Sequence, residues 1–203
     1  MYNSRIQYAI DNFIEEDYFL PMNSSYQLKE TVLIPESVLT LYVDGENICV
    51  EEYDKKKRCN FLRSSCGMQK CIDHFVLKSN GDNWDLYMIE MKTSVGNNTW
   101  NDIKAKIRSS LLNIRALCEF LGITVNEIYT YTTYERDCFN SLKDTADPKT
   151  MLPQFGEKAI NFKRDEWDKG VINITIDTMV TLPHAAIKME RNEDGELIGS
   201  LAI

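Results

Sequence analysis

Two acidic residues and a lysine occupy the ends of two neighbouring, largely apolar segments. Glu90 and Lys92 are two positions apart in the segment Trp84–Lys92. Asp73 lies in the preceding segment, Cys71–Leu77. Because side chains alternate across a strand, Glu90 and Lys92 are predicted to project from the same face. The polar turn between the two segments predicts a hairpin that brings Asp73 close to Glu90.

These residue types suit the binding of a divalent cation. The carboxylates of Asp73 and Glu90 and the backbone carbonyl of Met91 form a set of hard oxygen ligands for Mg²⁺, with Mn²⁺ as a substitute. Lys92 beside them could orient a water molecule and stabilise charge on a phosphoryl group. The alternative is that Glu90 and Lys92 form a structural salt bridge at a sheet edge, because unpaired buried charges are costly.

The acid–x–lysine spacing by itself is weak evidence. It recurs at Asp54, Asp102 and Asp147, which lie in a charged loop, at a helix start and in a proline-containing turn. Only Glu90 stands on an apolar strand with an acidic residue in the strand before it. The context therefore favours Glu90 and Lys92 as the functional pair.

The surrounding sequence predicts the elements that position this group. A helix is expected from Ser4, its cap, to about Leu20, and a longer helix from Thr99, its cap, to Gly122. Asp44-Gly45 predicts a hairpin between the first two strands. A loop is predicted for residues 144–156. The expected strands span residues 40–43, 47–53, 71–77, 84–92, 127–134, 171–176 and 185–189.

The order of these elements predicts an α/β fold with a mixed sheet. A chain of 203 residues can form one sizeable core. We therefore expect a single domain over residues 1–203, with its core in about 1–135 and a C-terminal β extension in about 150–203. No apolar run approaches the roughly 20 residues that a membrane span needs, and the N-terminus lacks a secretory pattern, so a cytoplasmic protein without membrane contact is expected.

The segments Cys71–Leu77 and Tyr87–Lys92 together resemble the core of the PD-(D/E)xK nuclease superfamily, which includes restriction endonucleases, Holliday junction resolvases and defence nucleases. The resemblance implies a restriction-endonuclease-like core of helix, three strands, helix and strand, with a mixed sheet flanked by helices. It makes Asp73 the metal-binding acid, and Glu90 and Lys92 the acid–x–lysine pair.

The resemblance also implies two accessory groups. A residue on the helix after the lysine is expected to contact the site or the substrate, and the candidates are Lys104, Lys106 and Arg108, of which Lys106 flanks the buried stripe most closely. An acid on the first helix is expected to join the metal site, and Glu15 and Glu16 are equal candidates.

The implied function is Mg²⁺-dependent hydrolysis of nucleic acid, with DNA favoured over RNA, in microbial defence or a mobile element. The alternative is a non-catalytic module that keeps the nuclease fold and binds protein or nucleic acid. The net charge of −8 argues against a broad positive surface. A partner subunit that supplies DNA binding and a homodimer therefore both stay open. With two histidines and no Cys-x₂-Cys spacing, the chain favours neither a multi-histidine site nor a zinc knuckle.

Overall fold

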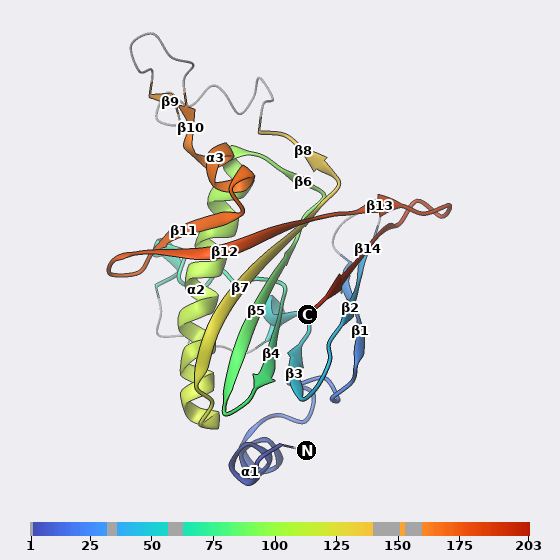
Figure 1. Cartoon of the computed structure of the whole chain (residues 1–203), viewed down its shortest axis with the longest axis vertical. Helices are drawn as coiled ribbons and strands as arrows, with labels where there is room; N and C mark the ends of the chain where they lie inside the picture. Colours follow the sequence, from blue (N-terminus) through green and yellow to red (C-terminus); the bar gives the residue numbers. More distant parts are fainter. Residues whose placement is uncertain (1, 32–35, 57–62, 140–150, 153–159) are drawn as a thin grey trace.

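The centre of the molecule is a six-stranded mixed sheet with the order β11-β12-β7-β5-β4-β3 (Figure 1). The computed structural model describes residues 2–31, 36–56, 63–139, 151–152 and 160–203. The strands of this main sheet are, in chain order, β3 (Asn47–Val50), β4 (His74–Asn80), β5 (Asn83–Met91), β7 (Val125–Tyr134), β11 (Val171–Thr175) and β12 (Met179–Lys188).

The strand directions divide the main sheet into a meander and a parallel part. β3, β4 and β5 pair antiparallel in succession. β7 then pairs parallel to β5, and β12 pairs parallel to β7. β11 closes the edge antiparallel to β12. The parallel step from β5 to β7 needs a crossover, and the helix α2 (Asn97–Leu121) provides it.

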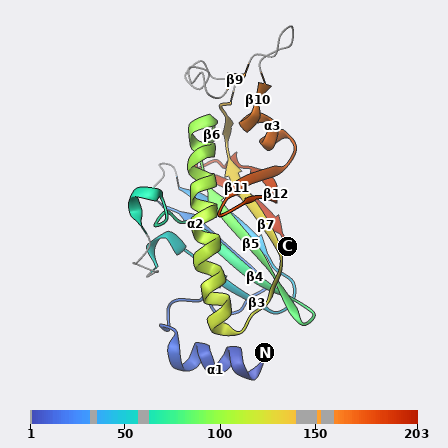
Figure 2. The same ribbon diagram turned by 90° about the vertical axis from the view of Figure 1, so that its left-hand side faces the viewer.

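The helix α2 covers one face of the main sheet (Figure 2). Its apolar stripe of Ile103, Ile107 and Leu111 packs in one cluster with alternate residues of β4 and β5, such as Phe75 and Met88. The helix begins two residues before the predicted Thr99, after Gly96 and without a side-chain cap. It ends as predicted at Gly122, whose φ of 72° is a conformation that glycine adopts easily.

The opposite face of the main sheet is covered by a second sheet with the order β1-β2-β14-β13. Leu28, Leu39 and Leu41 of this sheet cluster with Val76 and Ile89 of the main sheet. The fold is therefore mixed α/β, and the expectation of a sheet flanked by helices holds for one face only, since the second sheet covers the other. The strands of the second sheet are β1 (Ser25–Glu30), β2 (Ser37–Tyr42), β13 (Glu190–Arg191) and β14 (Leu197–Ala202).

The predicted hairpin at Asp44-Gly45 is also wrong, because β2 and β3 belong to different sheets. Both edges of β2 are occupied, one by β1 in antiparallel register and the other by β14 in parallel register. No edge of β2 is left for β3, which pairs with β4 instead. The turn at Gly45, with a φ of 79°, thus carries the chain from one sheet to the other.

The first helix, α1 (Ser4–Phe13), is shorter than predicted. Its cap is Asn3, whose Oδ1 accepts hydrogen bonds from the backbone N–H groups of Arg5 and Ile6. After Phe13 the chain extends toward the main sheet, where the N–H of Leu20 donates to the carbonyl of Cys49. Leu20 thus forms an isolated bridge to β3 and does not end a helix.

The C-terminal part adds strands to both sheets, β12 to the main sheet and β14 to the second one. It also contains a short helix, α3 (Phe162–Asp168), that the sequence pattern did not predict. The predicted loop at 144–156 lies mostly outside the described residues, and its part Met151–Leu152 forms a strand. Small elements are η1 (Tyr53–Lys55), η2 (Ser64–Cys66), β6 (Ser94–Val95), β8 (Arg136–Asp137), β9 (Met151–Leu152) and β10 (Ile160–Asn161). Over the described ranges, no helix is both long and apolar enough to cross a membrane.

Candidate functional site

The register of β4 and β5 places Asp73 next to Glu90. His74 pairs with Ile89, so the position before β4 stands opposite Glu90. The N–H of Met91 donates a 2.6 Å hydrogen bond to Oδ2 of Asp73. The N–H of Tyr53 donates to the carbonyl of Asp73 at 2.7 Å, which fixes the backbone from the other side. Asp73 is 3% exposed, so its carboxylate is held in one place inside the protein.

Glu90 lies on the face of β5 that α2 covers, and it is fully buried. Lys92 follows on the same face. Its ammonium group forms an ion pair with Oε1 of Glu90 and donates to the carbonyl of Met91 at 3.1 Å. The structure thus brings together all four groups that the sequence singled out, Asp73, Glu90, Lys92 and the carbonyl of Met91.

A second lysine reaches the same carboxylates from α2. Nζ of Lys106 lies 2.6 Å from Oε1 of Glu90 and 3.3 Å from Oδ1 of Asp73. Its side chain is 18% exposed. Lys106 is therefore the helix residue that contacts the candidate site.

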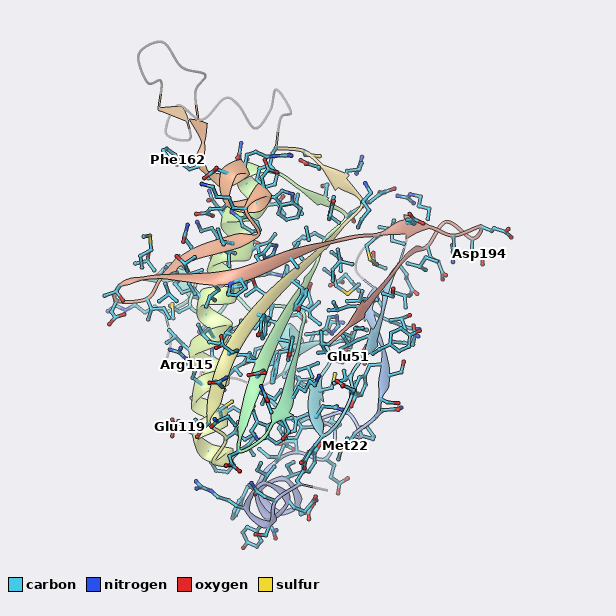
Figure 3. All side chains as sticks on the ribbon, in the orientation of Figure 1. Met22, Glu51, Arg115, Glu119, Phe162 and Asp194 are labelled. Atoms are coloured by element: carbon cyan, nitrogen blue, oxygen red, sulfur yellow. The ribbon has the colours of Figure 1, made fainter. Side chains whose placement is uncertain are left out.

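The other two basic candidates on α2 point elsewhere, because residues two apart lie on nearly opposite sides of a helix. Nζ of Lys104 is 2.9 Å from both carboxylate oxygens of Glu166 in α3. Nη2 of Arg108 donates to the carbonyl of Cys66 at 2.8 Å. Farther along the helix, Arg115 and Glu119 project to solvent (Figure 3). Of the three predicted substrate-binding residues, Lys106 therefore contacts the candidate site, whereas Lys104 and Arg108 have partners elsewhere.

The predicted acids of the first helix do not lie on a helix. Glu15 and Glu16 follow the end of α1 and line a pocket with Tyr2, Ile10 and Phe19. None of the residues of the candidate site lines that pocket. The placement of a metal-linked acid on the first helix is therefore wrong for both residues.

Burial raises the pKa of the Glu90 carboxyl to about 7, and the nearby charge of Asp73 adds to this effect. The charges of Lys92 and Lys106 oppose the shift. For Lys106, burial lowers the pKa of the amine, but the charges of Glu90 and Asp73 outweigh it, so the pKa is raised above its usual value. The fully charged group contains two carboxylates and two ammonium ions, and its net charge is zero.

The raised pKa of Glu90 predicts a pH-dependent stability. Below about pH 4.5 the carboxyl is protonated in both states, and between about 4.5 and 7 the unfolded chain releases a proton that the folded protein retains. The unfolding free energy should therefore fall by about 3 kcal/mol as the pH rises through this window. Urea denaturation of the wild type and of Glu90→Gln across this pH range measures the effect, since the unfolding free energy of the variant should fall less. An equal fall of the unfolding free energy in both proteins would contradict the assignment of the effect to Glu90.

Two polar atoms beside the ion pairs have no hydrogen-bond partner among the described residues. They are Oε2 of Glu90 and Oγ1 of Thr132, both buried. The two residues are direct neighbours across β5 and β7. Buried polar atoms are nearly always satisfied, so a water molecule or a bound group would complete both of these atoms. Sequence reasoning missed Thr132, because only the pairing of β7 with β5 relates it to Glu90.

His74 lies on the opposite face of β4 and does not join the site. It is fully buried, and its Nδ1 accepts a hydrogen bond from the N–H of Glu52 at 3.2 Å. Burial lowers the pKa of His74 to about 4, so the ring is neutral at pH 7. Glu52 has a φ of 51°, a left-handed conformation that is uncommon outside glycine. This turn positions Tyr53 against Asp73. The left-handed position is occupied by Glu52 and not by a glycine, so the sequence does not predict the turn.

The donor set fits a hard divalent cation. Asp73, Glu90 and the carbonyl of Met91 provide only oxygen ligands, which Mg²⁺ and Mn²⁺ prefer. The partnerless Oε2 of Glu90 is available for such an ion. No cluster of three or more His, Cys, Asp or Glu side chains forms within the described ranges, so a backbone carbonyl or water molecules would complete the coordination.

Comparisons with family models, with curated proteins and with solved structures yield no match to this chain. The geometry of Asp73, Glu90, Lys92 and Lys106 is therefore the ground on which its function is inferred.

Proposed function

We propose that this protein is a metal-dependent nuclease that hydrolyses phosphodiester bonds, with DNA as the favoured substrate and Asp73, Glu90 and Lys92 as its catalytic residues. The proposal rests on one observation above all. Two buried carboxylates, a backbone carbonyl and a lysine ammonium meet at the end of β5, held by the 2.6 Å hydrogen bond between Met91 and Asp73.

The topology supports this reading. The helix α1, the meander β3-β4-β5, the crossover helix α2 and the parallel strand β7 follow one another in the order that the PD-(D/E)xK resemblance implies. Asp73 immediately precedes the second strand of the meander, and Glu90 lies near the end of the third. The added strands β1, β2, β12 and β14 leave this order intact.

Each residue has a role that follows from its contacts. A bound Mg²⁺ would polarise the phosphate and lower the pKa of an attacking water. Oδ1 of Asp73 and the carboxylate of Glu90 are the proposed ligands, and Met91 keeps the Asp73 carboxylate oriented through its N–H. Lys92 stands within reach of Glu90 and the Met91 carbonyl, where its ammonium can orient the water and stabilise negative charge. Burial lowers the local dielectric and strengthens these interactions.

The mode of substrate binding is constrained by charge. The chain has a net charge of −8. Lys104 is already paired with Glu166, and Arg108 already donates to Cys66. Of the three basic candidates on α2, we retain only Lys106 as a substrate-facing group. We propose that a second copy of the chain or a partner subunit supplies the positive surface for DNA, in a cytoplasmic defence or mobile-element system.

Cleavage assays test the proposed function. Purified protein should cleave DNA in the presence of Mg²⁺ or Mn²⁺ and should not cleave it in EDTA. Lys92→Ala should lose this cleavage, by about 100-fold or more, because it removes a charge aimed at the reacting phosphate. Circular dichroism would verify that the variant is folded. Equal activity of wild type and Lys92→Ala would refute the role of Lys92.

A non-catalytic binding module is the second candidate, and one observation favours it. Both carboxylates are already paired with ammonium groups, so the cluster is electrically complete without a metal. Calorimetric titration with Mg²⁺ or Mn²⁺ separates the two functions. Binding that disappears in Asp73→Asn or Glu90→Gln supports the nuclease, and absence of binding in the wild type supports the module.

A further inference from the structure

The ammonium group of Lys106 lies between the two carboxylates of the site. It is 2.6 Å from Oε1 of Glu90 and 3.3 Å from Oδ1 of Asp73. Glu90 is fully buried and Asp73 nearly so. Lys106 belongs to α2, whereas Glu90 lies in β5 and Asp73 directly before β4, so a long side chain from a separate layer joins them.

The position of Lys106 coincides with the position that the proposed function assigns to a divalent cation. A carboxylate oxygen offers about two acceptor sites. Oε1 of Glu90 already contacts the ammonium groups of both Lys106 and Lys92. Oε2 of Glu90 is open to a cation, but a cation that also binds Oδ1 of Asp73 needs the place between the two acids that the ammonium group of Lys106 occupies. Lys106 is the one that bridges both acids, so its departure frees an oxygen on each of them.

The charge balance leads to the same conclusion. With both lysines in place and both acids ionised the group is neutral, so a divalent cation would bring two uncompensated positive charges into a buried site. The side chain of Lys106 is 18% exposed, so part of it already contacts solvent. Removal of this group from the carboxylates restores one negative charge for the incoming cation.

We propose that Lys106 is an internal counter-ion that takes the place of the divalent cation between Asp73 and Glu90 and is displaced when the cation binds. This inference rests on the proposed function. The displaced ammonium group would then be free to contact a phosphate oxygen of the substrate. Cation and substrate consequently bind more tightly together than separately, since linkage between two ligands is reciprocal.

Metal affinity in the absence of nucleic acid tests the proposal. Isothermal titration with Mn²⁺ and with Mg²⁺ should give weak binding to the wild type. Lys106→Met should bind each ion about tenfold more tightly or better, which corresponds to about 1.4 kcal/mol or more. Lys106→Arg keeps the charge and should remain as weak as the wild type. Lys104→Met is the matched control, because Lys104 lies on the same helix but pairs with Glu166.

Thermal melting provides an independent readout. Without metal, Lys106→Met leaves Glu90 and Asp73 under-compensated and should melt at a lower temperature than the wild type. Mn²⁺ should raise its melting temperature more than it raises that of the wild type. Lys106→Gln, which keeps a hydrogen-bond donor without the charge, serves if Lys106→Met does not fold.

The outcomes separate the inference from the proposed function. Equal affinities of wild type and Lys106→Met, with binding lost in Asp73→Asn, would overturn the displacement of Lys106 while leaving the metal site standing. Absence of binding in every variant would overturn the proposed function itself. Tighter binding in both Lys106→Met and Lys104→Met would show a general effect of charge and would also overturn the inference.

Discussion

Asp73→Asn should abolish metal binding and lower metal-dependent DNA cleavage by more than about 100-fold, since even changes to groups around a metal ligand cost about 10- to 100-fold. The amide retains an oxygen that can accept from the N–H of Met91, so the hairpin contact at 2.6 Å can persist. It loses the negative charge that faces Lys106 and, in the proposed function, the cation. Calorimetry with Mn²⁺ and a cleavage assay measure the two effects separately.

Asp85→Asn is the matched control for this substitution. Asp85 is also a buried aspartate of the β4–β5 hairpin, at 6% exposure. Its carboxylate accepts hydrogen bonds from Nδ2 of Asn80 and from the N–H of Glu127, and neither donor belongs to the candidate site. Cleavage should survive in this variant. If Asp73→Asn and Asp85→Asn reduce cleavage equally, the effect lies in the stability of the hairpin and the metal site is disproved.

Trp100→Ala should lower the unfolding free energy by about 3–5 kcal/mol, the range typical of a large aromatic removed from a core. Trp100 is fully buried and meets the rings of Phe139, Trp167 and His184 edge-on. Its Nε1 donates to Glu166 at 2.8 Å. The substitution leaves a cavity. It also removes a hydrogen-bond donor to the carboxylate of Glu166, which forms an ion pair with Lys104. Urea denaturation followed by circular dichroism measures the loss.

Phe120→Ala is the control for the loss of aromatic area on the same helix. Phe120 is 51% exposed near the C-terminal end of α2. Its truncation should change the unfolding free energy by about 0.5 kcal/mol or less, as is usual for surface positions. Similar losses in both variants would mean that the cluster around Trp100 does not join α2 to α3 and β12.

The alternation of side chains determined the faces of the sheet from sequence alone. Because β-strands have a period of two, Glu90 and Lys92 had to share a face, and His74 had to point away from Asp73. The short turn between β4 and β5 limited their register, and Asp73 accordingly lies opposite Glu90. The apolar stripe of α2 likewise predicted which side of the helix would meet the sheet.

Other features depended on contacts between distant segments. Lys104, Lys106 and Arg108 have the same charge and a regular spacing, and only the docking of α2 over β4 and β5 selected Lys106. The bridge from Leu20 to Cys49 accompanies the early end of α1, which left Glu15 and Glu16 outside the helix. Thr132 became a neighbour of Glu90 only when β7 paired beside β5.

The sequence by itself determined the residues that face inward within each element, because local periodicity and turn chemistry act over a few positions. Tertiary structure alone decided which elements became neighbours. The turn at Asp44-Gly45 has the chemistry of a hairpin, yet β1 and β14 occupy both edges of β2, so β3 pairs elsewhere. The ion pairs of Lys106 with Glu90 and Asp73 arise in the same way, because a buried charge is stabilised only by a partner that folding brings to it.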